Sequence, residues 1–374
     1  MKTQVVLVSA QAAPNVLAAA DVGLRPRRVV LVTSPAMRSR ADALAGVLRE
    51  MGSTVERLDL RDEHDPQAIE EDLLELAARL DGEEVHLNLT GGTKLMALTA
   101  LAVGETAGWS RFYVDVDSDH VVWLGRAAPP PRKLNESVRL RHYLGAYGIA
   151  IEGGPDRRPP TAAERSFVEE VLLYYDRHLQ ALPRLNAVLQ RAEDAGALTV
   201  ELNNEEQDSR SLAELIAVAQ RADLLRLDGA RVTVASEGSR DFLKGGWLEQ
   251  HLFDTVTHLG AEVPVRDRAR NLVLVQQGVK SELDVAFLCH NRLHVIECKT
   301  ANLRHGDGER AQEALFKLAE NARRLGGLAA RTLLVSYRPL REPELRLAGL
   351  LGVEIAHGRE VARLREKLIV WCGR

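Results

Sequence analysis

The sequence contains few cysteines, few aromatic residues and no long apolar run. Cys289, Cys298 and Cys372 show no CxxC spacing and cannot all pair, which disfavours a structural zinc and fits a reducing cytoplasm better than a secreted scaffold. No apolar run reaches the roughly 18 residues needed to span a bilayer, and the N-terminal run is too short for a signal peptide's core. We therefore expect a soluble cytoplasmic protein that has no membrane partner.

An excess of positive charge is also lacking. The 49 lysines and arginines stand against 53 aspartates and glutamates, so the formal net charge is −4. Bulk attraction therefore cannot bring the chain to nucleic acid, and any such binding must use a local basic patch. Aromatic residues make up 4% of the chain, which weakens the case for base-stacking platforms and hence for base-specific recognition.

The 374 residues are too many for one ordinary core and predict two or three domains. Over residues 1–127, short Val- and Leu-rich strands alternate with amphipathic helices, which predicts a Rossmann-like α/β domain with a parallel sheet. Proline-rich breaks punctuate residues 128–240, a linker followed by helices and a hairpin at Asp228-Gly229 that resemble a winged helix-turn-helix. A helical connector carrying a hairpin would give the same pattern. Residues 241–374 predict a second α/β domain with its own core.

A strand in this last domain looks buried but ends in charged residues. The segment "SELDVAFLCHNRLHVIECK" is two apolar runs around a short connection, which is typical of a β-hairpin. If residues 290–291 form the turn, Asp284 lies opposite Glu297, and if residues 291–292 form it, Asp284 lies opposite Lys299. In both registers the three side chains share one face of the sheet.

Two carboxylates at this spacing suit a divalent cation. Directly opposed side chains have Cβ atoms about 4.5–5.5 Å apart, so Asp284 and Glu297 would repel each other unless they share a cation. All-oxygen ligands favour Mg²⁺ or Mn²⁺ over zinc. Lys299 points at the same place, where it can hold an attacking water or offset charge in a phosphorane-like transition state. The sequence therefore predicts a metal-binding phosphodiesterase site, although a surface ion pair of Glu297 with Lys299 would use the same residues.

Two other charged residues could join this site. Glu249 begins a helix that could pack on the sheet and would supply a third carboxylate, and the alternative is a favourable acid in a first helical turn. Lys317, in "LFKLAEN", could reach a phosphate, or it is an ordinary solvated helix lysine. Cys298 faces away from the metal side and is expected in the core.

These residues resemble a known nuclease motif. Asp284, the tripeptide Glu297-x-Lys299 and an upstream helix carboxylate resemble the PD-(D/E)xK restriction-endonuclease-like nucleases. Leu283 stands where the proline that names the motif is found. The resemblance implies that Asp284 and Glu297 are the metal ligands. It further implies that Lys299 is the catalytic lysine and that Glu249 is the helix carboxylate.

The N-terminal domain contains a glycine-rich turn, "LNLTGGTKLM", between a strand and a helix. Glycines there let backbone N–H groups approach a ligand, and the helix N-terminus attracts anions. The turn matches neither GxGxxG nor GxxxxGK[ST], which disfavours a dinucleotide dehydrogenase or an ATPase. Polar loops after two other strands are expected at the same sheet edge, where ligands of open parallel sheets bind; a glycine-rich turn without a ligand is the alternative. The candidate ligand-binding residues are Ser9, Gln11, Asn15, Thr33, Ser34, Met37, Asn88, Thr90, Gly91, Gly92, Thr93 and Lys94.

The segments "NLTGGTKLM", "VSAQAAPN" and "VTSPAM" resemble the CARF domain, the CRISPR-associated Rossmann fold. Together with the winged-helix-like region and the nuclease motif, they make essentially the whole chain similar to a family of type III CRISPR ancillary nucleases. The resemblance implies a homodimer that binds a cyclic oligoadenylate and then cleaves nucleic acid with Mg²⁺ or Mn²⁺ in antiviral defence. Cyclic tetra-adenylate, a ring with a two-fold axis, suits a C2 dimer. The substrate would be DNA, which it would nick, or single-stranded DNA or RNA.

Three rival functions use the same features. The first is a ligand-responsive winged-helix transcription regulator with an inactive nuclease domain, and the intact Asp284, Glu297 and Lys299 argue against it. The second is an ungated restriction-type enzyme whose first domain only dimerises. The third, a Rossmann-like domain that degrades the messenger, is compatible with the main hypothesis.

Overall fold

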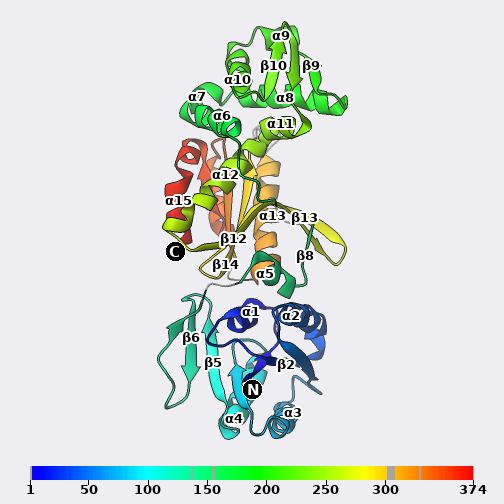
Figure 1. The fold of residues 1–374 in the computed structure, drawn as a ribbon, viewed down its shortest axis with the longest axis vertical. Helices are drawn as coiled ribbons and strands as arrows, with labels where there is room; N and C mark the ends of the chain where they lie inside the picture. The colour runs from blue at the N-terminus through cyan, green and yellow to red at the C-terminus, as the bar shows by residue number, and fades with distance from the viewer. Residues whose placement is uncertain (1, 136–137, 154–155, 301–307, 328–329, 374) are drawn as a thin grey trace.

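The computed structural model describes residues 2–135, 138–153, 156–300, 308–327 and 330–373. It contains three sheets stacked along one long axis (Figure 1). A seven-stranded sheet lies at one end, a six-stranded sheet in the middle and a three-stranded sheet at the other end. The N-terminal and C-terminal α/β units therefore touch directly, although the sequence separates them by the helical region. Within the described ranges, every helix is too short or too polar to span a bilayer.

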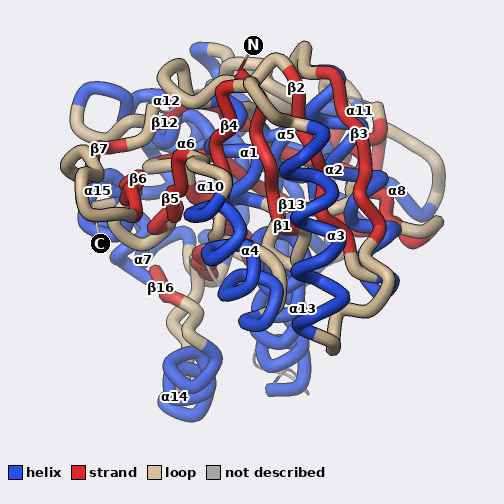
Figure 2. Tube along the Cα trace, turned by 90° about the horizontal axis from the view of Figure 1, so that it is seen from below, coloured by secondary structure: helices blue, strands red, loops and turns tan. Residues whose placement is uncertain are grey.

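The seven-stranded sheet has the order β3-β2-β1-β4-β5-β6-β7, and Figure 2 shows these strands side by side. The first five are mutually parallel, and the last two are antiparallel. The strands are β1 (Lys2–Leu7), β2 (Arg28–Thr33), β3 (Thr54–Asp59), β4 (Glu84–Asn88), β5 (Ser110–Asp115), β6 (His120–Leu124) and β7 (Arg132–Lys133). The Rossmann-like α/β fold predicted from the alternating pattern is confirmed.

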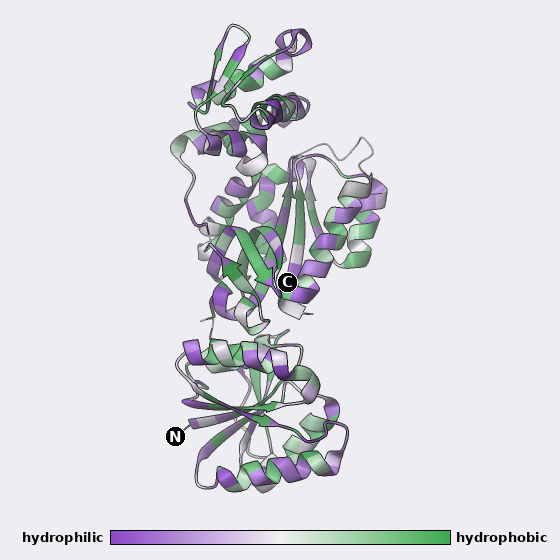
Figure 3. Cartoon of the chain, turned by 90° about the vertical axis from the view of Figure 1, so that its right-hand side faces the viewer, coloured by the Kyte–Doolittle hydropathy of each residue, from purple (hydrophilic) through white to green (hydrophobic). Residues whose placement is uncertain are grey.

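Helices cover both faces of this sheet, as the continuous apolar runs of its central strands require. One face packs against α1 (Ala13–Ala20) and α2 (Arg38–Glu50), and the other against α3 (Pro66–Arg79) and α4 (Lys94–Thr106). In Figure 3 these helices carry hydrophobic residues along one side and hydrophilic residues along the other. The short helix α1 lies where the sequence predicts only a loop.

The middle region contains the elements α5 (Leu140–Ala146), β8 (Ala150–Glu152), α6 (Ala162–Leu173), α7 (Tyr175–His178), α8 (Ala181–Asp194), β9 (Thr199–Glu201), α9 (Asn204–Gln207), α10 (Arg210–Arg221), β10 (Leu225–Asp228), β11 (Arg231–Val234) and α11 (Glu237–Asp241). From α8 onward the order helix, strand, two helices and hairpin is that of a winged helix. The predicted turn is confirmed, because Asp228 pairs with Arg231 and Gly229 has a φ of 58°. Strand β8 departs from the sequence-based division, since it pairs with a strand of the C-terminal sheet.

The C-terminal sheet has the order β16-β15-β14-β13-β12-β8. Strands β12, β13 and β14 form an antiparallel meander, and β14, β15 and β16 are parallel. One face packs against α13 and α14 and the other against α12 and α15. The elements are α12 (Trp247–Thr257), β12 (Val265–Gln276), β13 (Val279–Cys289), β14 (Arg292–Lys299), α13 (Gly308–Gly326), β15 (Arg331–Ser336), α14 (Glu342–Leu351), β16 (Glu354–His357), a 3-10 segment η5 (Gly358–Arg363) and α15 (Leu364–Cys372).

One hydrophobic cluster runs across the junction of the two α/β units. It joins residues of α1 and α2 to α5 and to the α13-facing side of the C-terminal sheet. Tyr143 of α5 is fully buried in this cluster. A shared core of this kind resists independent motion of the two units, because separating them would expose apolar surface to water.

Candidate active site and ligand-binding edge

The β13–β14 hairpin turns at His290 and Asn291, which have φ values of 48° and 55°. This left-handed pair is the signature of a type I′ turn. Cys289 therefore pairs with Arg292, and the ladder continues to the pair Val285 with Ile296. One step further, the same count sets Asp284 across from Glu297. The structure thus selects the first of the two registers that the sequence allows.

The two faces of β14 have different surroundings. Ile296 and Cys298 lie in the core that α12 and α15 cover, and Cys298 is buried as expected. Glu297 and Lys299 alternate with them and therefore face the α13 side. The sheet thus presents its charged groups to one helix, at the end of β14 that is furthest from the hairpin turn.

Two lysines and a backbone amide contact the facing carboxylates. Lys299 Nζ lies 2.6 Å from Glu297 Oε1, and Lys317 Nζ of α13 lies 3.7 Å from the same oxygen. Asp284 Oδ2 accepts a hydrogen bond of 2.6 Å from the Cys298 backbone N–H. The sequence treats Lys317 as a solvated lysine at least as readily as a site residue, and only the packing of α13 on this face places it here.

The carboxylates raise one another's pKa values. Burial, followed by the charges of Glu297 and Glu249, raises the pKa of Asp284 to about 7. Burial also raises the pKa of Glu249. For Lys299, burial lowers the pKa, but the charges of Glu297 and Asp284 outweigh it and the net shift is upward. Negative charge is therefore in excess at this site, and an added cation would relieve it.

The donor chemistry fits a hard divalent cation. Asp284 and Glu297 offer carboxylate oxygens only, which suits Mg²⁺ or Mn²⁺. Across the described ranges, however, no group of three or more His, Cys, Asp or Glu side chains stands in metal-binding geometry. Glu249 therefore does not complete a three-carboxylate cluster in this conformation. It lines, with Lys299 and Lys244, an adjoining cleft of about 360 Å³.

The predicted ligand-binding loops meet at one edge of the N-terminal sheet. Strand β1 lies between β2 and β4, so the chain leaves β1 to one side and later returns on the other. The carboxyl ends of β1 and β4 form a topological switch point, where open α/β sheets bind ligands. The structure brings the loops after β1 and β4 together there, and the loop after β2 lies one strand further along.

The glycines of the loop after β4 have a steric cause. A Cβ atom on Gly91 would lie 2.1 Å from the Leu7 carbonyl oxygen, and Gly92 has a φ of 76°. Thr93 caps α4, because its Oγ1 accepts a hydrogen bond of 3.2 Å from the Met96 N–H. The loop therefore packs against β1 and leaves Lys94 exposed in the first turn of α4.

Several predicted contact residues are buried and bonded to one another instead. Asn88 Nδ2 donates to Asn15 Oδ1 at 3.0 Å, and Thr90 Oγ1 donates to Asn88 Oδ1 at 2.6 Å. Thr33 and Ser34 are buried as well. These side chains fix the strand ends and the loops, so direct ligand contact falls to the more accessible residues. Those are Ser9, Met37, Gly92, Thr93 and Lys94.

The ligand-binding edge also contacts the C-terminal unit. Gln11 lies against Gly327, just beyond the end of α13, where a Cβ atom would stand 2.0 Å from Gln11 Oε1. At the hairpin turn, Asn291 Nδ2 donates to Asp119 Oδ1 at 2.6 Å. Arg292 donates to the Val116 carbonyl oxygen at 3.2 Å. The sequence gives no sign of these contacts, because each partner is an ordinary loop residue in its own domain.

Two family models match the chain. Residues 3–143 match the model described as the Card1 CARF domain. Residues 236–373 match the model described as the Card1-like endonuclease domain. A search of curated proteins found no match.

Solved structures share the fold over the full length. Protein VC1899 from Vibrio cholerae is 26% identical with a TM-score of 0.89, and the match covers 100% of this chain and 98% of that one. Can2 from Sulfobacillus thermosulfidooxidans, in complex with cyclic tetra-adenylate, is 23% identical with a TM-score of 0.80 and coverage of 100% and 99%. A type III CRISPR defence DNA nuclease activated by cyclic oligoadenylate is 23% identical with a TM-score of 0.58; the match covers 91% of this chain and 47% of that one.

Proposed function

The chain joins a Card1 CARF domain to a Card1-like endonuclease domain, and we propose that it is a metal-dependent endonuclease of type III CRISPR antiviral defence, activated by a cyclic oligoadenylate. The observation that carries this proposal is the β13–β14 hairpin. It sets Asp284 across from Glu297, with Lys299 on the same face and an open cleft beside it. A sheet gains nothing by opposing two carboxylates unless a cation joins them.

In this proposal the chain's residues hold the metal and the substrate phosphate. A Mg²⁺ or Mn²⁺ ion held by Asp284 and Glu297 would neutralise phosphate charge and acidify a water molecule. Lys299 has a raised pKa and stays protonated, so its ammonium stabilises negative charge at the phosphate. Glu249, buried at the start of α12, adds a negative group at the rim of the same cleft.

The proposed ligand of the N-terminal edge is a cyclic oligoadenylate. The 13-residue helix α4 begins at this edge, and its free N–H groups and the exposed Lys94 suit a phosphate. Can2, which has the same fold, is described in complex with cyclic tetra-adenylate. That ring has a two-fold axis, so it matches the paired pockets of a C2 homodimer. Leu95 and Leu98 of α4 are 40% and 65% exposed beside the edge and suit burial between two copies.

The junction between the units supplies a route for activation. The hairpin turn is fixed to the N-terminal unit by Asn291, and its other end carries the candidate catalytic residues about seven steps along β14, roughly 23 Å away. The end of α13 is fixed by Gln11 through Gly327, and the same helix carries Lys317. A ligand that shifts the edge therefore moves both elements that carry the site. The free energy available is its differential affinity for the two arrangements.

A cleavage assay tests this function. Plasmid, single-stranded DNA and RNA are incubated with the full-length protein and Mn²⁺ or Mg²⁺, with and without a panel of cyclic oligoadenylates. Cleavage that requires both a metal and one ring supports the proposal and identifies substrate and activator. Equal cleavage without any ring would identify an ungated restriction-type enzyme. Ring-dependent binding to a DNA site without cleavage would identify a transcription regulator.

A further inference from the structure

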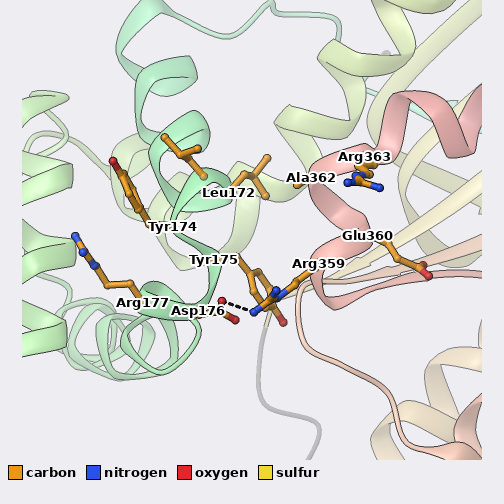
Figure 4. Close-up of a pocket in the computed structure, with 10 residues that line it drawn as sticks. Leu172, Tyr174, Tyr175, Asp176, Arg177, Arg359, Glu360, Ala362 and Arg363 are labelled. Atoms are coloured by element: carbon orange, nitrogen blue, oxygen red, sulfur yellow. Dashed lines mark hydrogen bonds and ion pairs between the residues drawn. The ribbon is translucent and has the colours of Figure 1, made fainter.

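A second cleft lies between the middle helices and the C-terminal sheet (Figure 4). It has a volume of about 720 Å³ and is formed by the end of α6 and α7 on one side and η5 on the other. Three arginines line it, Arg177, Arg359 and Arg363, together with Tyr174. We refer to it as the arginine cleft.

The arginine cleft shares a sheet edge with the candidate active site. Lys299 of β14 is in register with Ser336 of β15, which is in register with His357 of β16. Segment η5 follows His357 directly, so the cleft begins about two strand spacings, roughly 10 Å, from Lys299. Tyr337 bridges the two places. Its N–H donates to the Lys299 carbonyl oxygen at 2.9 Å, and its ring centroid lies 4.9 Å from that of Tyr175, which lines the cleft.

The arginines of this cleft are available to an anion. Arg363 is exposed and has no ion pair with any residue that the structure describes. Arg359 pairs with Asp176 at 2.5 Å, but the two side chains are 76% and 68% exposed. An exposed pair of this kind contributes little to stability, so Arg359 can exchange the carboxylate for a phosphate, which accepts a bidentate guanidinium contact.

Tyr174 adds a feature that favours nucleic acid over a simple anion. The Arg177 guanidinium lies 5.0 Å from the centre of the Tyr174 ring, and the residue is 43% exposed. Arginines that line a groove beside an accessible aromatic ring are the combination with which proteins hold single-stranded nucleic acid. This aromatic ring is accessible in a chain that has few aromatic residues.

We propose that the arginine cleft binds the sugar-phosphate backbone of a single-stranded segment of the substrate, next to the cut site. This inference rests on the proposed nuclease function and adds the path of the substrate to it. A cavity of this volume takes a ligand of roughly one or two nucleotides, whereas a duplex is too wide to enter it. Contacts to backbone phosphates carry no base sequence, so binding here is independent of sequence.

The test compares two double variants of the full-length protein. Arg359→Gln with Arg363→Gln removes two charges from the cleft, and Arg226→Gln with Arg231→Gln removes two exposed charges from the β10–β11 hairpin. Cleavage of a long single strand is measured with metal and activator. The cleft variant is expected to raise KM about tenfold with kcat nearly unchanged and to reduce the salt dependence of binding by roughly 0.7 per lost phosphate contact. The hairpin variant is expected to match wild type.

A gain-of-function variant guards against a folding artefact. Asp176→Asn frees Arg359 from its ion pair and is expected to lower KM, which a misfolded protein cannot do. Binding of the same strand to a Glu297→Gln protein, followed by fluorescence anisotropy, tests the cleft even if wild type cleaves nothing. The inference is overturned if the cleft variant binds and cleaves like wild type, or if the hairpin variant loses as much. Loss of cleavage in wild type would instead refute the proposed function.

Discussion

Asn291 donates a hydrogen bond of 2.6 Å to Asp119, and the two residues belong to different α/β units. Each is 5% exposed and each has a positive φ, 55° for Asn291 and 59° for Asp119. The bond joins the turn of the hairpin that carries Asp284 and Glu297 to the loop between β5 and β6. It is therefore a direct mechanical link between the proposed sensor and the proposed nuclease.

Removing this link is expected to weaken activation. Asn291→Gly keeps the left-handed backbone and deletes the donor. A hydrogen bond to a charged group contributes about 1.5–3 kcal/mol, so the ratio of activated to basal cleavage is expected to fall about tenfold or more, with ligand affinity nearly unchanged. The control is Gln277→Gly, an exposed turn residue with a φ of 51° in the β12–β13 hairpin. An activation ratio equal in both variants would argue against the link.

Asp119 is expected to make stability depend on pH. Burial raises its pKa, and the charges of Lys133, His290 and His120 offset this only in part. Because the raised pKa means that the folded state prefers the protonated carboxyl, the stabilisation is present at low pH and is lost as the pH rises through the folded pKa. Asp119→Asn cannot ionise and keeps an acceptor for Asn291.

The melting temperature of the Asp119→Asn protein, measured against wild type over the acid to neutral range, checks this prediction. The variant is expected to gain on wild type as the pH rises towards neutrality. A difference that stays constant, or that grows in acid, would contradict the role given to Asp119.

Lys317 is expected to contribute to cleavage. Its Nζ lies 3.7 Å from Glu297 Oε1, and the side chain is half-exposed towards the cleft side of the sheet. Lys317→Met removes a cation from a site with excess negative charge, and cleavage is expected to slow roughly tenfold or more, with partial recovery in Lys317→Arg. Arg323→Met, at an exposed position of the same helix, is the control. Equal rates for Lys317→Met and wild type would return Lys317 to the status of a solvated surface residue.

Gly91 is expected to tolerate no side chain. A Cβ atom there would meet the Leu7 carbonyl oxygen at 2.1 Å, so Gly91→Ala forces the loop after β4 away from β1. The expected cost is about 1–3 kcal/mol of stability, with loss of oligoadenylate binding. Gly46→Ala, where an added Cβ meets nothing within 4 Å on α2, is expected to stabilise the fold by roughly 0.5–1 kcal/mol. Unfolding curves and ligand titration of both variants decide the matter.

The local parts of this structure follow from sequence. Alternating apolar runs and amphipathic helices predict the parallel sheet, and the short connection around Asn291 predicts a hairpin that sets Asp284 on the face of Glu297. The choice between turns at 290–291 and 291–292 could not be made, because Asn291 accepts the left-handed conformation in either.

The long-range parts do not follow from sequence. Burial of Asn15 and Asn88 depends on how β1 and β4 sit side by side, and both residues look like exposed loop polar groups in the sequence. The same holds for β8, which the chain inserts into the C-terminal sheet long before the rest of that sheet appears. The approach of Lys317 to Glu297 depends on a helix crossing over the sheet. Each of these needs the tertiary packing that periodicity alone does not specify.

The most direct measurement compares three proteins in one assay of cleavage and oligoadenylate binding with Mn²⁺: wild type, Glu297→Gln, and Thr93→Ala with Lys94→Ala. Wild type is expected to bind the ring and to cleave only in its presence. Glu297→Gln is expected to bind the ring without cleaving, and the Thr93 and Lys94 double variant to lose both binding and activated cleavage. Cleavage by Glu297→Gln at the wild-type rate, or ring-stimulated cleavage by the double variant at that rate, would contradict the account.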